Sequence, residues 1–275
     1  MEKYGKSMVS RTISHVSFLM CKFLFSILCV GPIPAHIALI MDGNRRFAKR
    51  HVLLEDGTDP ASGHRVGFKS LMSTIQYCYE MGMKCVTVYA FSTDNFKRGP
   101  EEVELLMNLM KEKLDEVLTD ENMLKKLDVK INIWGHLELI PEPVRLAAKK
   151  AMDVTMHNKG PVLSVCMAYS STNEITHAIE ASIRDTRGNG TQIGVCDLER
   201  NLFTAGCVDP DIIIRTSGET RLSNFLLWQS DFTHLQNPNA LWPEFSLRQF
   251  VLSVMDYQLV HAYLQKKKGE IEKNK

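Results

Sequence analysis

The chain is organised around one stretch, His36-Ile37-Ala38-Leu39-Ile40-Met41-Asp42-Gly43-Asn44-Arg45-Arg46-Phe47-Ala48-Lys49-Arg50. An apolar run of strand length ends there in an acid, a glycine, an amide and two arginines. In open α/β sheets, polar groups collect beyond the carboxyl ends of the strands, where ligands bind. Asp42 can hold a hard cation such as Mg²⁺, and Gly43 lets the backbone approach a ligand closely. Arg45 and Arg46 can bind phosphate oxygens. The plain alternative is a solvated strand-to-helix turn.

The composition is that of a soluble globular protein, with 24% charged and 44% apolar residues among 275. A net charge of +1 argues against a general polyanion binder, so we expect no nucleic acid partner and only a local basic site. The seven cysteines occur singly, without zinc-ligand spacing, as expected of reduced intracellular thiols.

The first thirty residues differ from the rest. Residues 16–30 are mostly Phe, Leu, Ile, Met and Cys, interrupted by Lys22 and two serines. About 15 residues is short of the roughly 20 that span a bilayer. We expect 1–30 to form an uncleaved apolar helix that lies at a membrane interface or over a pocket entrance. A cleaved signal peptide and a helix simply docked on the protein are the alternatives.

Strand and helix patterns alternate along the rest of the chain. β-branched or apolar runs predict strands at Ile37–Met41, Cys85–Phe91, Val129–Trp134, Val162–Tyr169 and Asp211–Ile214. Helices are predicted over His64–Met81, from Pro100, over Pro143–His157, from Ser171 and over Ser246–Tyr257. Ser171 and Glu174 have the spacing of a capping box. This order predicts an α/β domain with a mainly parallel central sheet flanked by helices, over 31–263, and a charged tail over 264–275.

Three of the predicted strands end in polar clusters: Asp42–Arg46, Ser92–Arg98 and Arg215–Ser223. Because the carboxyl ends of parallel strands share one edge, we expect the clusters to converge. Together they offer five arginines and a well-placed acid, which suits diphosphate groups held with a divalent cation. Taken alone, an arginine such as Arg215 or Arg221 more often forms a surface ion pair.

Four stretches of the sequence resemble the motifs of the cis-prenyltransferases. They are His36–Arg46, Tyr89–Phe96, Ile214–Gln229 and Leu241-Trp242-Pro243-Glu244, and the likeness covers roughly Gly31 to Tyr263. The doubled arginine and the Arg-Thr-Ser-Gly-Glu form are similar to the eukaryotic branch of dehydrodolichyl diphosphate and plant rubber or polyprenol synthases. No Asp-Asp pair occurs, which disfavours the aspartate-rich enzymes that make trans-prenyl chains.

The resemblance implies a Mg²⁺-dependent elongation of an allylic prenyl diphosphate, such as farnesyl diphosphate, by isopentenyl diphosphate. Asp42 would hold Mg²⁺, and Asn95, with Ser92, would orient the leaving group and assist proton loss. The allylic diphosphate would be cradled by Gly43, Asn44, Arg45, Arg46 and Arg98, beside His64, Phe47 and Phe96. Isopentenyl diphosphate would be held by Arg215, Arg221 and Ser223. The same motifs add Thr93, Asp94 and Leu222 to the substrate-binding residues.

The helices that begin near His64 and Pro100 would wall a hydrophobic tunnel for the growing chain, as the resemblance implies. The second helix carries apolar residues at helical spacing, including Leu106, Met110 and Leu114. From spacing alone, such a stripe is more often ordinary core.

Three departures from the family pattern bear on activity. Pro60 stands where many relatives have an arginine, four residues before His64, and His234 replaces a metal-assisting glutamate, leaving it as a weak candidate ligand. The tail, Lys268–Lys275, has no Arg-x-Gly ending. We therefore expect a homologous accessory subunit that bears Arg-x-Gly, and a membrane surface, as partners. A weakly active or non-catalytic subunit of a heteromeric complex is the alternative. The expected location is the cytoplasmic face of the endoplasmic reticulum membrane, or the cytoplasm.

Overall fold

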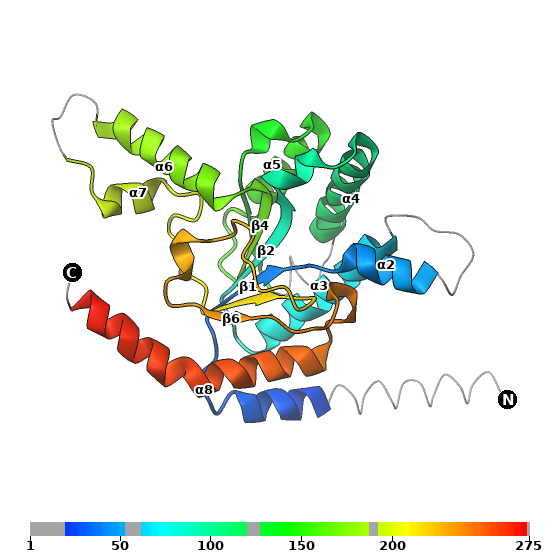
Figure 1. Ribbon diagram of the computed structural model, residues 1–275, viewed down its shortest axis with the longest axis vertical. Coiled ribbons are helices and arrows are strands. Elements are labelled where there is room, and N and C mark those ends of the chain that lie inside the picture. The colour runs from blue at the N-terminus through cyan, green and yellow to red at the C-terminus, as the bar shows by residue number, and fades with distance from the viewer. Residues whose placement is uncertain (1–19, 53–61, 120–126, 187–191, 274–275) are drawn as a thin grey trace.

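The structure is a computed structural model that describes residues 20–52, 62–119, 127–186 and 192–273 (Figure 1). In this part of the chain a six-stranded sheet forms the centre, and all its pairings are parallel. Its strands, in spatial order, are β3 (Lys130–Trp134), β4 (Val162–Tyr169), β2 (Cys85–Ser92), β1 (His36–Ile40), β5 (Ile212–Arg215) and β6 (His234–Gln236). The predicted fold class is confirmed.

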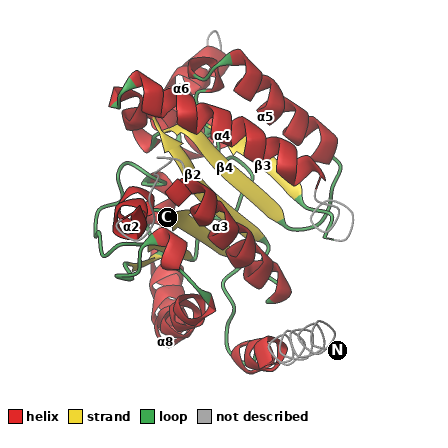
Figure 2. Ribbon diagram, turned by 90° about the vertical axis from the view of Figure 1, so that its right-hand side faces the viewer, coloured by secondary structure: helices red, strands yellow, loops and turns green. Residues whose placement is uncertain are grey.

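Helices connect the strands and cover both faces of the sheet (Figure 2). They are α2 (Asn44–Val52), α3 (Ser62–Glu80), α4 (Pro100–Thr119), α5 (Glu142–Thr155), α6 (Ser171–Thr186), α7 (Val195–Asn201) and α8 (Leu247–Glu272). Strand side chains alternate between the faces, so Ile37 and Leu39 belong to one buried cluster and Ala38 and Ile40 to another. The first cluster includes residues of α3, α4, α5 and α8, and is the larger core.

Residues 20–28 form a helix that packs against α3 and α8 (Figure 1). Phe25 and Leu28 are buried, and the ring of Phe25 lies 6.0 Å from that of Tyr77. Phe23 and Ile27 remain exposed on the other side. The described part of the N-terminal segment is therefore docked on the protein and still presents an apolar face. Among the described residues, no helix combines the length and hydropathy needed to cross a membrane.

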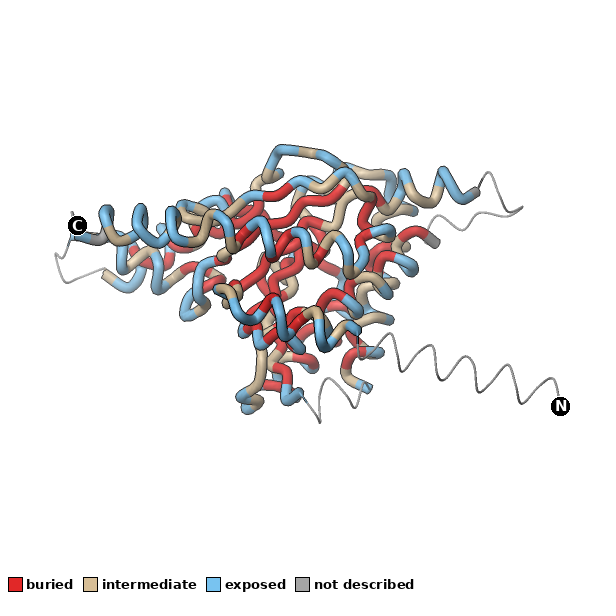
Figure 3. The backbone as a smooth tube through the Cα atoms, turned by 90° about the horizontal axis from the view of Figure 1, so that it is seen from below, coloured by how far each residue is buried: buried red, intermediate tan, exposed pale blue. Residues whose placement is uncertain are grey.

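Four elements differ from the sequence prediction. β6 and α7 were not expected, because both are short and largely polar. α8 runs on to Glu272, across the predicted boundary between domain and tail, and its C-terminal part is mostly exposed (Figure 3). The capping box predicted at the start of α6 is wrong: Glu174 is buried and accepts hydrogen bonds from Tyr169 and Gln229 instead.

Candidate active site

The order of the strands reverses at β1: the chain adds β2 on one side of β1 and later β5 on the other. Ligand crevices in doubly wound sheets open at such a switch point. The register pairs Ile40 of β1 with Arg215 of β5, so the first and third polar clusters leave the sheet side by side.

The carboxylate of Asp42 accepts hydrogen bonds from two guanidinium groups. Arg215 Nη2 lies 2.8 Å from Oδ2, and Arg46 Nη2 lies 3.3 Å from Oδ1. Partial burial opposes the charge on Asp42, but Arg215 and then Arg46 outweigh it and hold the pKa below its usual value. The side chain is 27% exposed. Asp42 is thus an ionised carboxylate that a ligand can reach.

The guanidinium of Arg215 is nearly buried, with 6% of its side chain exposed. Its Nη1 donates to Ser223 Oγ and to the backbone oxygen of Arg221, both at 2.6 Å. Its Nε has no hydrogen-bond partner among the residues that the structure describes. Ser223 adopts a positive φ of 51°, an uncommon conformation that turns the loop back toward Arg215.

Glu219 links Arg46 to Arg221. Its carboxylate lies 3.6 Å from Arg46 Nη2 and 2.5 Å from Arg221 Nη1. Arg46 also donates to the Ser217 hydroxyl. Asp42, Arg46, Arg215 and Arg221 therefore form one connected charge network.

The second predicted cluster, at the end of β2, is joined to the third through Tyr89. The Tyr89 hydroxyl donates to the backbone oxygen of Ser223 at 3.2 Å. Ser92 caps a short 3-10 helix, η1 (Thr93–Lys97): its Oγ accepts from the Asp94 N–H, and its own N–H donates to Asn95 Oδ1 at 3.0 Å. The capping box fixes Ser92 and Asn95 relative to each other.

Phe96 and Asp94 lie on opposite sides of η1. The Phe96 ring packs on Phe91 with centroids 4.9 Å apart, whereas Asp94 is exposed and pairs with Lys97 at 2.6 Å. The part of η1 that faces the protein interior is therefore Phe96.

Glu102, at the start of α4, holds the two other arginines. Its Oε1 lies 2.8 Å from Arg98 Nη1 and 3.7 Å from Arg45 Nη1. His64 stands near these charges, and burial, followed by Arg98, lowers its pKa to about 4. His64 is consequently a neutral ring at physiological pH, beside a cationic edge.

The turn after β1 is built for close packing. Gly43 has φ of 109°, and a Cβ there would meet the Leu241 side chain at 2.9 Å. Trp242, in the fourth family-like stretch, donates its backbone N–H to the backbone oxygen of Asp42 at 2.9 Å. Asn44 donates to the backbone oxygen of Met41, while its buried Oδ1 has no partner within the described part of the chain. Leu241 and Trp242 therefore hold the strand end that presents Asp42.

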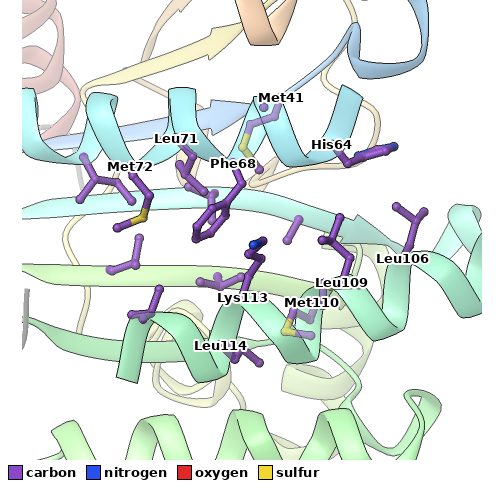
Figure 4. Close-up of a pocket in the computed structure, with 18 of the residues that line it drawn as sticks. Met41, His64, Phe68, Leu71, Met72, Leu106, Leu109, Met110, Lys113 and Leu114 are labelled. Carbon is purple, nitrogen blue, oxygen red and sulfur yellow. The ribbon is translucent and has the colours of Figure 1, made fainter. Parts of the chain in front are cut away.

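An apolar cavity opens beside this turn, between α3 and α4 (Figure 4). Asn44 and His64 line it near the polar cluster, and Ile75 and Val117 line it further along the two helices.

Three predicted site residues lie elsewhere. His234 pairs with Ile212 at the amino end of β5, and its Nε2 is 2.8 Å from Asp256 Oδ2. Within this chain it is therefore not a ligand that could share a cation with Asp42. The ring of Phe47 packs at a tilt against that of His51, and Leu222 packs against the core on the other face of the sheet. Pro60 lies outside the described residues.

The donor set fits a Mg²⁺ ion shared with a substrate. In the described part of the chain, no group of three or more His, Cys, Asp or Glu side chains could hold a metal by itself. Mg²⁺ is commonly held by one or two carboxylates together with substrate phosphates. Asp42 is ionised, partly exposed and surrounded by arginines suited to diphosphate, so the residues present match that mode.

The arginine-rich edge of the doubly wound sheet and the apolar cavity beside it suit a ligand with an anionic head and an apolar tail. Residues 40–264 match the family model described as putative undecaprenyl diphosphate synthase. The chain belongs to this family, the cis-prenyltransferases, and is a prenyltransferase.

Individual relatives agree with this assignment. A dehydrodolichyl diphosphate synthase of Solanum lycopersicum is 44% identical over 98% of this chain and 100% of its own length. The dehydrodolichyl diphosphate synthase complex subunit of Homo sapiens is 37% identical over 89% of this chain and 73% of its own. The lavandulyl diphosphate synthase of Lavandula x intermedia, solved with dimethylallyl diphosphate, has a TM-score of 0.76 at 28% identity, covering 82% of this chain and 95% of its own.

Sequence reasoning missed Glu102, Glu219 and Tyr89. Glu102 follows Arg98 by four residues on a helix start, a spacing at which opposite charges pair. Glu219 lies in the family-like stretch Ile214–Gln229, but its position there did not indicate that it pairs with Arg46 and Arg221. Tyr89 joins two clusters through a loop whose course no local pattern indicated.

Proposed function

We propose that this chain condenses isopentenyl diphosphate onto an allylic prenyl diphosphate, with Mg²⁺, to give a cis-polyprenyl diphosphate. One observation carries the proposal: the Asp42 and arginine network adjoins the apolar cavity, because Met41 and Asn44, which flank Asp42 in the chain, line that cavity. A diphosphate head and a hydrocarbon tail on one substrate need these two environments in contact.

The residues divide the work as follows. Arg45, Arg46 and Arg98, with Asn44 and the Gly43 backbone, bind the allylic diphosphate, while Arg215, Arg221 and Ser223 bind isopentenyl diphosphate. Mg²⁺, held by Asp42, supplies charge neutralisation on the departing diphosphate. The allylic carbon–oxygen bond breaks, a carbon–carbon bond forms to isopentenyl diphosphate, and a proton leaves the latter. Asn95 and Ser92, fixed by their capping box, orient the groups at this step.

We further infer that the active form includes an accessory homologous subunit. Leu252, Met255, Leu259 and Tyr263 are exposed and lie along one stripe of α8, at helical spacing. Exposed apolar stripes of this kind favour a protein interface. The human relative's name, complex subunit, is consistent with a heteromer. The alternative, a weakly active or non-catalytic subunit, is favoured by the departures at Pro60, at His234 and in the tail. Against it, Asp42, Arg46 and Arg215 are all in place.

The proposed location is the cytoplasmic face of the endoplasmic reticulum membrane, or the cytoplasm. Phe23 and Ile27 support membrane contact, being 69% and 52% exposed on an otherwise docked helix. The test is fractionation and intact-mass analysis of the expressed chain and of Phe23→Glu/Ile27→Glu. Loss of the membrane fraction in the variant would support the proposal, and a mature form beginning near Gly31 would contradict it.

The decisive experiment for the reaction measures incorporation of labelled isopentenyl diphosphate into farnesyl diphosphate, followed by product sizing. It is run with and without a candidate Arg-x-Gly subunit, and with and without Mg²⁺. Mg²⁺-dependent incorporation into chains longer than the primer supports the proposal. Absence of incorporation under every condition would overturn it.

A further inference from the structure

A lysine, Lys113, lines the otherwise largely apolar cavity between α3 and α4 (Figure 4). It extends from α4 toward Phe68 of α3, and its Nζ lies 5.0 Å from the centroid of that ring. At this distance a cation over an aromatic face is attracted to it. Nothing in the reaction proposed above uses this charge.

The ammonium group is held at the rim of the cavity by two acids of its own helix. Nζ lies 2.6 Å from Glu116 Oε1 and 3.0 Å from Glu112 Oε1. Both glutamates are about half exposed, whereas the Lys113 side chain is only 17% exposed. Burial opposes the charge, but the hydrogen bonds to Glu116 and Glu112 outweigh it and raise the pKa above its usual value. The charged end therefore faces the solvent side, and the alkyl stem lies against the cavity.

Lys113 and Phe68 together span the side of the cavity that the sheet does not close. α3 packs closely on α2 and on the 3-10 helix η5 (Trp242–Glu244), and α4 packs on α5. The contact of Lys113 with Phe68 joins α3 to α4 across the cavity. Along α4, Lys113 lies seven residues beyond Leu106, which corresponds to a rise of ~10 Å along the helix. Val117 lies eleven residues beyond Leu106, or ~16 Å along the helix.

We propose that the alkyl stem of Lys113, held across the gap by Glu112, Glu116 and Phe68, closes the side of the tunnel and so limits product length. The inference rests on the proposed function. A chain that grows from the strand ends passes Lys113 and then meets Ile75 and Val117 further along. With the side of the tunnel closed, the end of the cavity at Ile75 and Val117 opposes the addition of further isoprene units. Removing the stem gives the tip of the chain a lateral exit, and elongation continues.

The test compares Lys113→Ala with Lys111→Ala. Lys111 belongs to the same helix and pairs with Asp115 at 2.9 Å, but it does not line the cavity. Both variants lose one charge. With farnesyl diphosphate, labelled isopentenyl diphosphate, detergent and the accessory subunit, Lys113→Ala should lengthen the main product by at least one isoprene unit. Lys111→Ala should give the wild-type products.

A second variant, Glu112→Gln/Glu116→Gln, leaves the residues that line the cavity unchanged. It tests the role of Lys113 in product length even if Lys113→Ala does not fold. It should shift products in the same direction by releasing the ammonium group. Unchanged product lengths in the folded variants, with normal total incorporation, would overturn this inference and leave the proposed function standing. A shift in Lys113→Ala alone would overturn the role of the two glutamates. No incorporation by the wild-type chain would instead count against the proposed function.

Discussion

Arg215 Nη2 lies 2.8 Å from Asp42 Oδ2, although 173 residues separate the two in sequence. The parallel pairing of β1 with β5 produces this contact, because Ile40 and Arg215 share a register. The pair joins the part of the site proposed for the allylic diphosphate and Mg²⁺ to the part proposed for isopentenyl diphosphate. Both charges are needed by the fold as well, since Arg215 is nearly buried.

Replacing Asp42 by Ala should lower turnover by orders of magnitude, because it removes the carboxylate proposed to hold Mg²⁺. It should also cost about 1–3 kcal/mol of unfolding free energy, because it leaves a nearly buried guanidinium without its acid. Asp115→Ala is the matched control, since that acid also pairs with a cation but lies on the outer face of α4. Steady-state rates and chemical denaturation measure the two effects. Near-normal Mg²⁺-dependent elongation by Asp42→Ala would rule out the assignment.

Arg45 and Arg221 should separate the two substrates. Their side chains are similarly exposed, at 64% and 62%, and each pairs with one glutamate, so neither replacement should disturb the fold. Arg221→Ala should raise the KM for isopentenyl diphosphate about tenfold to hundredfold, since a charge-assisted phosphate contact is worth roughly 1.5–3 kcal/mol. Arg45→Ala should raise the KM for the allylic primer instead. Equal effects of both variants on both substrates would contradict the division.

Much of the fold and of the site's location could be predicted because local patterns are strong there. The runs at His36–Ile40 and Val162–Tyr169 are continuous and apolar, and parallel strands must bring their carboxyl ends to one edge. This placed Asp42 near Arg215 without any knowledge of side-chain contacts.

What could not be predicted depends on tertiary contacts. β6 has only three residues, His234-Leu235-Gln236, and its place in the sheet puts His234 against Asp256 rather than near Asp42. Glu174 has the spacing of a capping residue, but a buried Tyr169 and Gln229 compete for its carboxylate. Sequence spacing cannot show which partner prevails.

His64 should make stability depend on pH. Burial and then Arg98 lower its pKa to about 4, from 6.5, so the fold favours the neutral ring. This stability is complete above pH 6.5 and is lost as pH falls from 6.5 toward 4. Over that window, the wild-type free energy of unfolding should fall by up to about 1.4 kcal/mol per pH unit more than that of His64→Gln. Denaturant titrations at several pH values measure the difference, and parallel curves would show that the prediction is wrong.

The last prediction is that the chain has little activity until an accessory subunit bearing Arg-x-Gly is added. Asp42 is the protein carboxylate proposed for Mg²⁺, and His234, on β6 beside the amino end of β5, lies too far away to assist it. A second chain that closes the pocket would exclude water and strengthen the hold on cation and diphosphate.

The exposed stripe on α8 is where that subunit should bind. Leu259 is 84% exposed, so Leu259→Lys should leave the chain folded and abolish stimulation by the partner. Leu146→Lys is the matched control, because Leu146 is 58% exposed on α5, away from α8 (Figure 1). Incorporation is measured as the partner is titrated, together with size-exclusion chromatography of the mixture. Full activity of the chain by itself, at a rate that the partner does not change, would overturn the heteromer. Normal stimulation of Leu259→Lys would place the interface elsewhere.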